Sequence, residues 1–283
     1  MINKIIYKLL IFISKFLPLG YSGVIHKFCT YLLSEVLSYR KKVIIDNLHL
    51  AFPQFEEAQL IKIMKGYYHQ LSAYVLETLM LFSKDKKWFR HKMSYHLPEK
   101  MKLQLESKSV IVMGSHQGNW EWAAVLFPIF TGIHAHAVYK PLSNKALDVL
   151  VKDARSRFGL GLLSMKEVVR YMATHHEPVV YFFVADQSPG DIHSGKWFSF
   201  LGQETLFLNG AEQLAKKYQL PVWVQTIRRT KGSSYEVTFT ELPAEAITTT
   251  YVKRLEADIQ REPESWLWSH KRWKHKHPQN LKM

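Results

Sequence analysis

The chain has 283 residues, of which 47% are hydrophobic and 22% are charged, and this balance excludes a disordered protein and a polytopic membrane protein. Its formal net charge of +14 favours an anionic partner, such as a phospholipid surface, an acidic protein or substrate, or a nucleic acid. The single cysteine, Cys29, excludes an intrachain disulfide bond, which fits a reducing compartment.

Residues 1–20 predict an amphipathic helix that anchors the protein to a membrane. The apolar run is interrupted by Lys8 and Lys15 and ends at Pro18, so it falls short of the roughly 20 apolar residues that cross a bilayer. At about 100° per residue, Lys4, Lys8 and Lys15 share one stripe of a helix whose remaining surface is apolar. This pattern is typical of a helix in the membrane interface. A tilted anchor with its lysines reaching the headgroups and a helix packed on the protein's own core are the alternatives.

The rest of the chain, residues 21–283, predicts one α/β domain. Its first part, residues 21–83, has helix-compatible patterns with an interruption at 51–55. Apolar runs then predict strands at 109–115, 133–140, 178–187, 221–229 and 234–242. Periodic segments predict helices from about 119 and at 144–159, 165–175, 208–218 and 249–262. This alternation predicts a mixed, largely parallel central sheet flanked by helices, with its last two strands antiparallel and ligands bound beyond the carboxyl ends of the strands.

The segment "GSHQGNWEWA" (114–123) follows the first of these strands and predicts a catalytic pair. On one straight helix His116 and Glu121 would point about 140° apart and could not meet. They can meet if His116 lies on the strand-to-helix turn, Gly118 allows the backbone to bend and Asn119 caps the helix. A carboxylate that accepts the imidazole N–H fixes the tautomer that a general base needs. The free N–H groups of the helix N-terminus would be available to an oxyanion or a phosphate.

Other chemistries are not supported by the motifs. The middle residue of "GSHQG" is histidine, where a nucleophile elbow requires serine. The zinc-protease motif H-E-x-x-H is absent, and no Walker or Rossmann glycine pattern indicates a nucleotide cofactor. His134 and His136 alternate on one strand and could form a metal pair, but no third ligand is evident. We therefore expect neither a metal nor a cofactor.

Six segments carry a resemblance to a known family. They are "YRKKVIIDNLHLAFP" (39–53), "GSHQGNWEWA" (114–123), "KDARSRFG" (152–159), "VVYFFVADQSPG" (179–190), "NGAEQLAKKYQLPVW" (209–223) and "REPESWLWSHKRWKHK" (261–276). Together they resemble the late acyltransferases of lipid A biosynthesis, of the lauroyl/myristoyl type, within the wider glycerolipid acyltransferase superfamily. The resemblance covers nearly the whole chain. One departure is Ser115, where many members have asparagine before the histidine.

The resemblance implies transfer of a fatty acyl chain from the thioester of acyl carrier protein to a hydroxyl of a lipid A precursor. His116 would deprotonate that hydroxyl and Glu121 would orient the imidazole, so that the alkoxide attacks the thioester directly and no acyl-enzyme forms. General-base assistance of this kind contributes about 10²–10⁴-fold in rate. The implied location is the cytoplasmic face of the inner membrane. The alternatives are the same chemistry on an aminolipid or a lysophospholipid, and a basic nucleic-acid-binding protein.

Arg155 and Arg157 are candidates for binding substrate. They point about 160° apart on a helix, so only one of them faces the cleft. That arginine could hold a phosphate or the phosphopantetheine of the carrier protein. The resemblance favours Arg157.

Four further residues are predicted to contact substrate. Asp186 and Gln187 follow a strand and match the family's "DQ" block, although Asp186 could instead cap the following turn. Lys140 also follows a strand and could bind an anionic group, and Asn119 lies between the two residues of the proposed catalytic pair.

The C-terminal region alternates aromatic and basic residues and predicts contact with an anionic membrane surface. Tryptophans would lie at headgroup depth, and each cation near the lipid would contribute about 1 kcal/mol. Packing of part of this region in the core, stacking on nucleic acid, and docking of an acidic carrier protein are the other interpretations. Membrane and carrier protein together account for the charge, so no nucleic acid is needed. The residues concerned are Trp266, Trp268, Lys271, Arg272, Trp273, Lys274 and Lys276.

Overall fold

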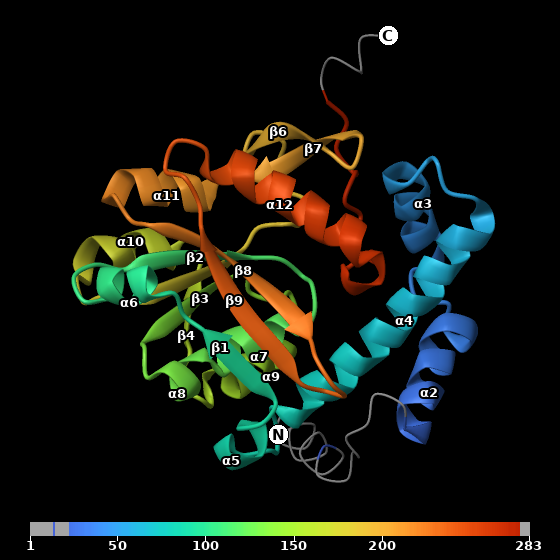
Figure 1. Cartoon of the computed structure of the whole chain (residues 1–283), viewed down its shortest axis with the longest axis horizontal. Helices are drawn as coiled ribbons and strands as arrows, with labels where there is room; N and C mark the ends of the chain where they lie inside the picture. The colour runs from blue at the N-terminus through green and yellow to red at the C-terminus, as the bar shows by residue number, and fades with distance from the viewer. Residues whose placement is uncertain (1–13, 15–22, 278–283) are drawn as a thin grey trace.

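A seven-stranded sheet forms the centre of the molecule (Figure 1). The computed structural model describes residues 14 and 23–277, so the helix predicted over residues 1–20 lies, apart from Ser14, outside the described residues. The strand order is β1-β9-β8-β2-β5-β3-β4. Strands β4, β3, β5, β2 and β8 are parallel, β9 is antiparallel to β8, and β1 is parallel to β9. The predicted mixed, largely parallel sheet is therefore confirmed. The strands are β1 (Met93–His96), β2 (Val110–Gly114), β3 (Ala135–Tyr139), β4 (Gly161–Ser164), β5 (Val180–Val184), β8 (Val222–Arg229) and β9 (Tyr235–Glu241).

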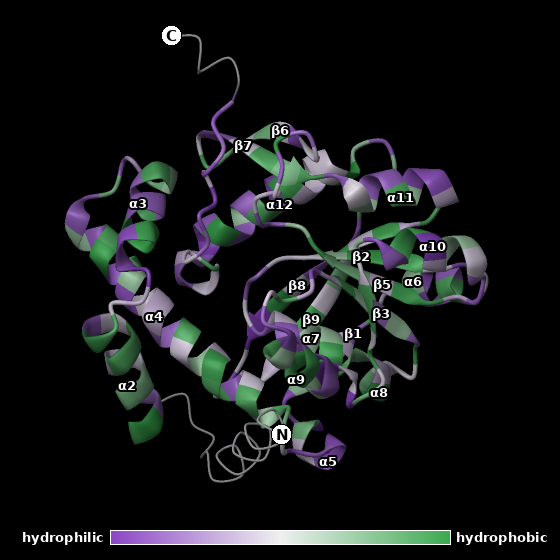
Figure 2. Cartoon of the chain, turned by 180° about the vertical axis from the view of Figure 1, so that it is seen from behind, coloured by the Kyte–Doolittle hydropathy of each residue, from purple (hydrophilic) through white to green (hydrophobic). Residues whose placement is uncertain are grey.

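Strand β2 shows why the sheet is covered on both faces. All five of its residues are buried. Val110 and Val112 belong to the core on one face, whereas Ile111 and Met113 belong to the core on the other. A strand that is apolar on both sides is typical of a parallel sheet between two helical layers. Figure 2 shows the corresponding band of hydrophobic residues along the central strands.

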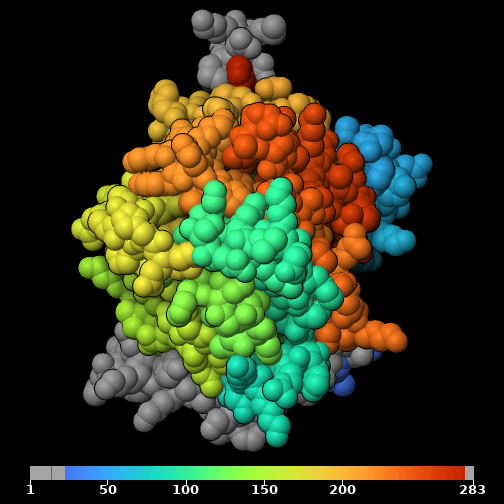
Figure 3. All heavy atoms as spheres, turned by 60° about the vertical axis from the view of Figure 1, so that its left-hand side comes forward, coloured from blue at the N-terminus to red at the C-terminus, as the bar shows by residue number. Residues whose placement is uncertain are grey.

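Helices pack on both faces of this sheet. On one face α12 buries Ile247, Tyr251, Leu255 and Ile259, spaced four residues apart along a single stripe. Figure 3 views the molecule from a side on which helices of both faces are visible, α10 and α11 from one face and α6 from the other. The helices of the first face are α10 (Glu167–Thr174), α11 (Gly210–Tyr218) and α12 (Ile247–Arg261). The other face has α6 (Glu99–Leu105), α7 (Trp120–Val125) and α8 (Phe127–Thr131), with α9 (Lys145–Ser156) beside α7 and the short α5 (Lys86–Phe89) nearby.

The longest helix, α4 (Glu57–Met80), runs diagonally past the sheet and carries the N-terminal helices on its outer side (Figure 1). A capping box of Glu56 and Gln59 starts it by satisfying backbone N–H groups of its first turn. Helix α2 (Val24–Tyr31) leads into the π-helix η1 (Leu32–Val36), and α3 (Lys41–Ala51) follows. None of the helices in the described part of the chain is both long and apolar enough to cross a membrane.

Two elements after β5 were not predicted from the sequence. The segment between β5 and α11, which reads as a loop in the sequence, contains a hairpin of β6 (Gly195–Phe200) and β7 (Gln203–Leu208). Leu201 and Gly202 join its strands with φ values of 52° and 72°, which is the two-residue geometry that matches the twist of a hairpin. Beyond α12, the C-terminal segment (residues 262–277) begins with a 3-10 turn, η2 (Pro263–Ser265), and returns to the carboxyl ends of the parallel strands.

Candidate active site

His116 and Asp186 meet at the carboxyl edge of the sheet. Gly114 and Val184 are paired at the ends of the adjacent strands β2 and β5, and each of the two side chains lies two residues further on. The imidazole Nδ1 of His116 lies 2.6 Å from Asp186 Oδ1, and the backbone N–H of His116 donates to Asp186 Oδ2 over 2.8 Å. Parallel neighbours end at the same edge, so equal positions after the two strands bring these groups together.

This contact determines the tautomer of the histidine. The Asp186 side chain is only 2% exposed, and this burial raises its pKa. The charge and hydrogen bonds of His116, together with the N–H of Trp266, outweigh burial and hold the pKa of Asp186 below its ordinary value. The ionised carboxylate accepts a proton from Nδ1, which leaves the lone pair of the neutral imidazole on Nε2. The side-chain amide nitrogen of Gln187 lies 3.1 Å from Nε2. The His116 side chain is 18% exposed, so the imidazole can be reached from solvent.

The predicted contact between Glu121 and His116 is wrong. Glu121 is buried in the first turn of α7 and faces α9, where its carboxylate pairs with the guanidinium of Arg155. Two parallel hydrogen bonds, of 2.5 and 2.8 Å, join Nε and Nη2 of Arg155 to the two carboxylate oxygens. This pairing raises the pKa of Arg155 despite the opposing effect of burial. The carboxylate that orients the imidazole therefore comes from the neighbouring strand and not from the following helix.

The turn between β2 and α7 has the geometry expected from the sequence. Gly118 adopts a φ of 58°, and a Cβ atom there would lie 3.0 Å from a methyl carbon of Ile227. Asn119 caps α7 because its Oδ1 accepts the N–H of Trp122 over 2.9 Å. Asn119 is fully buried, however, so its predicted role in substrate binding is wrong. Its cap also occupies one of the N–H groups that the helix start was expected to offer to an anion.

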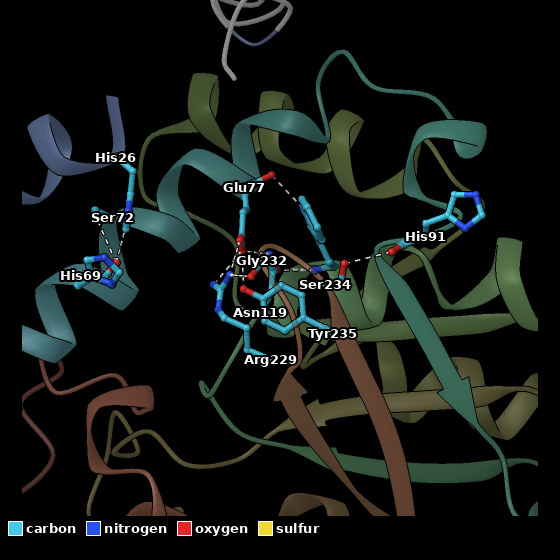
Figure 4. A network of polar contacts seen from close by, with 11 residues as sticks. His26, His69, Ser72, Glu77, His91, Asn119, Arg229, Gly232, Ser234 and Tyr235 are labelled. Carbon is cyan, nitrogen blue, oxygen red and sulfur yellow. Dashed lines mark hydrogen bonds and ion pairs between the residues drawn. The ribbon is translucent and has the colours of Figure 1, made fainter. Parts of the chain in front are cut away.

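A buried polar network fixes the start of α7 from the side of α4 (Figure 4). The carboxylate of Glu77 accepts hydrogen bonds from Asn119 Nδ2 (2.8 Å) and from the hydroxyl of Tyr235 (2.6 Å), and it pairs with Arg229 (2.9 Å). The indole N–H of Trp122 donates to the backbone oxygen of Glu77 over 2.9 Å. The sequence contained one signal for this network, since Glu77 is a carboxylate on the face of α4 that is otherwise apolar and buried.

The two arginines of the "ARSRFG" segment have the opposite placement from the one that the resemblance favoured. Arg155 lies at the site with Glu121, whereas Arg157 donates from Nη1 to the backbone oxygens of Leu81 and Lys84, each over 2.8 Å. A cation at the carbonyl end of α4 stabilises that helix end. Arg157 therefore supports the end of α4, and its binding of substrate stays a prediction.

Lys140 and Gln187 have different relations to the site. Lys140 is exposed just after β3, and β5 separates that strand from β2. No contact joins it to His116 among the residues that the structure describes, so its anion-binding role stays a prediction. Gln187 contacts the imidazole directly, as a substrate-facing residue would.

A pocket opens beside the imidazole. Its walls are mixed apolar and polar, and the ring of Trp120 lies between the imidazole and α4. The centroid of the Trp120 ring is 5.0 Å from that of His116, and the ring stacks on Tyr74 of α4 at 3.9 Å. The pocket is lined by Tyr67, Gln70, Leu71, Tyr74, His116, Gly118, Trp120, Arg229, Ser265, Trp266 and Leu267.

The C-terminal segment belongs largely to the core, which corrects its prediction as a membrane contact. Trp266 is 2% exposed and Trp268 is fully buried. Arg272 is also buried, with its guanidinium 4.1 Å from the centroid of the Phe207 ring. The lysines at 271, 274 and 276 are exposed. Trp266 donates its indole N–H to Asp186 Oδ2 over 2.8 Å. No motif or residue spacing in the sequence indicated this contact.

The side chains that could ligate a metal do not assemble into a site. Within residues 14 and 23–277, no group of three or more histidine, cysteine, aspartate or glutamate side chains is arranged to hold a metal ion. His136, one of the two alternating histidines, packs against the rings of Tyr171 and Tyr181.

Comparison with known proteins identifies the family of the chain. The model of the bacterial lipid A biosynthesis acyltransferase family matches residues 3–275. The lipid A biosynthesis palmitoleoyltransferase of Escherichia coli (strain K12) is 23% identical over 249 residues, which cover 84% of this chain and 80% of that protein. The lipid A biosynthesis acyltransferase of Shigella flexneri matches with the same identity and coverage. The chain belongs to the bacterial lipid A biosynthesis acyltransferase family.

Proposed function

We propose that this member of the family moves a fatty acyl chain from the thioester of acyl carrier protein to a hydroxyl of a lipid A precursor, in one step and without an acyl-enzyme. The observation that carries the proposal is the His116 imidazole, whose Nδ1 is bound by the buried Asp186 and which lines the pocket. A neutral imidazole held in this way is a general base.

In the proposed reaction, Nε2 of His116 removes the proton of the acceptor hydroxyl as its oxygen attacks the thioester carbonyl. The new ester C–O bond forms and the C–S bond breaks. The proton on Nε2 then passes to the departing thiolate, so the carrier leaves as a free thiol and the imidazole returns to its neutral form. Asp186 stabilises the imidazolium that exists between these transfers. In the structure the Gln187 amide donates to Nε2 over 3.1 Å, and in this proposal it turns to the oxygen of the incoming substrate, which frees the Nε2 lone pair for the proton.

Glu121 acts through Arg155 in this proposal. Glu121 engages Nε and Nη2 of the guanidinium, which leaves Nη1 without a hydrogen bond among the described residues. The Arg155 side chain is 28% exposed, and in this proposal Nη1 binds an anionic group of a substrate, such as a phosphate. The fixed ion pair holds the guanidinium in one orientation before substrate binds.

The protein works, in this proposal, at the cytoplasmic face of the inner membrane. Residues 1–20 provide the anchor, and the anionic membrane surface and the acidic carrier protein are the partners that the charge of +14 favours. The lipid precursor reaches the pocket from the membrane, and the carrier protein delivers the acyl chain from the aqueous side.

The test is acyl transfer by the purified His116→Ala variant, with His134→Ala as the control. His134 is exposed and lies before β3, so its removal deletes an imidazole without touching the site. We expect the rate for His116→Ala to fall by at least about 10²-fold. A rate near that of the wild type would refute the base assignment. Mass spectrometry of lipid A and of total lipids from a deletion strain identifies the acceptor, because an aminolipid or a lysophospholipid acceptor would leave lipid A unchanged.

A further inference from the structure

We infer that Trp266 is a positioning residue of the active site, whose indole N–H holds the Asp186 carboxylate in the orientation that His116 requires. The inference rests on the proposed function of His116 as the general base. It gives a role in the active site to Trp266, a residue of the C-terminal segment that lies 80 residues along the chain from Asp186.

Three N–H groups converge on the Asp186 carboxylate. Oδ1 faces Nδ1 of His116 at 2.6 Å, whereas Oδ2 accepts both the backbone N–H of His116 and the indole N–H of Trp266, each over 2.8 Å. The bond to the imidazole needs one particular rotation of the carboxylate. Because Trp266 and the backbone N–H approach the other oxygen, they fix that rotation and keep Oδ1 directed at Nδ1.

Trp266 is itself held by its backbone and by its ring. The backbone of Trp266 forms a bridge with Gln117, the residue after His116. Its ring packs edge-on against Trp268, with centroids 4.8 Å apart, and against Phe200 at 5.9 Å. Trp266 therefore connects the loop after β2 with the loop after β5.

The loop after β5 is tied to the C-terminal segment at a second point. The backbone N–H of Ser188, two residues after Asp186, donates to Nε2 of His270 over 3.0 Å. The hydroxyl of Ser188 donates to the backbone oxygen of Arg272. These bonds hold the backbone of the loop, so the indole of Trp266 meets a carboxylate at a fixed position.

Trp268 provides a matched control in the same segment. Its ring is fully buried, and its indole N–H donates to the backbone oxygen of Pro263 over 2.6 Å. Pro263 belongs to neither the loop after β2 nor the loop after β5. Trp266→Phe and Trp268→Phe therefore each remove one buried indole hydrogen bond. Only the first of them removes a bond to Asp186.

The experiment measures acyl transfer by full-length Trp266→Phe, Trp268→Phe, Asp186→Asn and the double variant Trp266→Phe/Asp186→Asn. We expect Trp266→Phe to lower kcat by about tenfold with KM nearly unchanged, since a charge-assisted hydrogen bond is lost. Trp268→Phe should stay within about twofold. In the Asp186→Asn background, Trp266→Phe should have no further effect on kcat, because it acts through the group already altered. Additive losses, or equal losses for the two phenylalanine variants, would overturn the inference.

A second readout does not depend on activity. In protein labelled with ¹⁵N-histidine, the Nδ1 proton of His116 should exchange with solvent faster in Trp266→Phe than in the wild type and in Trp268→Phe. Unchanged exchange would overturn the positioning role. Faster exchange together with full activity of His116→Ala would uphold that role and refute the proposed function. If Trp266→Phe fails to fold, replacement of Trp266 by benzothienylalanine removes the N–H and keeps the shape of the ring.

Discussion

Replacing Asp186 by asparagine tests the arrangement most directly, because the change removes a charge and keeps the shape of the side chain. The carboxylate accepts three N–H groups with its two oxygens. An asparagine has one oxygen and one amide nitrogen, so at least one of these donors would face another donor. The His116 imidazole can relieve this by moving its proton from Nδ1 to Nε2. The atom proposed to accept the substrate proton would then already carry one.

The magnitude follows from the two functions of the carboxylate. General-base catalysis contributes about 10²–10⁴-fold, and the wrong tautomer removes most of that contribution. Loss of the negative charge also removes the stabilisation of the imidazolium. We therefore expect kcat to fall by about 10²-fold or more, while KM changes little because Asp186 is buried. The mismatched donor should lower the free energy of unfolding by about 1–3 kcal/mol.

The assay is single-turnover acyl transfer at saturating substrate, with urea denaturation to follow stability. Asp191→Asn is the control, since Asp191 is exposed in the loop that follows and the same chemical change there should leave the rate within about twofold. A folded Asp186→Asn variant with a rate close to that of the wild type would show that Asp186 does not orient the base.

Five further variants test three other features of the structure. Arg155→Ala should lower kcat/KM by about tenfold or more in steady-state assays. Arg157→Ala should stay within about threefold, because Arg157 binds backbone oxygens at the end of α4. Equal losses would contradict the assignment of Arg155 as the substrate-binding arginine. Gly118→Ala should cost about 2–4 kcal/mol in urea denaturation and Gly132→Ala only about 1 kcal/mol, because both have positive φ but an added Cβ meets the neighbouring strand only at Gly118. Burial, with a neighbouring buried arginine, lowers the pKa of His270 to about 4. Its neutral form therefore stabilises the fold fully above pH 6.5, and that stability should be lost as the pH falls towards 4, with a smaller dependence on pH in His270→Asn.

Local pattern was sufficient to predict β2, β3, β5, β8 and β9, their carboxyl edge and the position of His116 on it, but not the short edge strands β1 and β4. The apolar runs mark buried strands, and Gly118 and Asn119 mark the turn and the helix start after β2. The order of the strands was not available, because β5 inserts between β2 and β3 although β3 and β4 precede it in the chain. Without that order, nothing in the sequence shows that Asp186 lies nearer to His116 than Glu121 does. The short spacing along the chain therefore favoured Glu121 as the carboxylate that orients the imidazole.

The C-terminal segment shows a different limit. Alternating tryptophan and basic residues occur both at membrane interfaces and in cores where cations stack on rings, so composition does not distinguish them. Burial of Trp266 and Arg272 depends on the β6–β7 hairpin and on the loop after β5, which supply the rings of Phe200 and Phe207 and the carboxylate of Asp186. These are contacts over long sequence separations.

The same separations explain why the histidine motif alone is a weak signal for the site. His116 lies 70 residues from Asp186, and Asp186 lies 80 residues from Trp266. The imidazole acquires its tautomer only after β5 has paired with β2, and the carboxylate acquires its rotation only after the C-terminal segment has packed. A general base at this edge is therefore a property of the assembled sheet and not of the decapeptide. A change that breaks the bond between Trp266 and Asp186 should therefore reduce activity before it reduces the stability of the central strands.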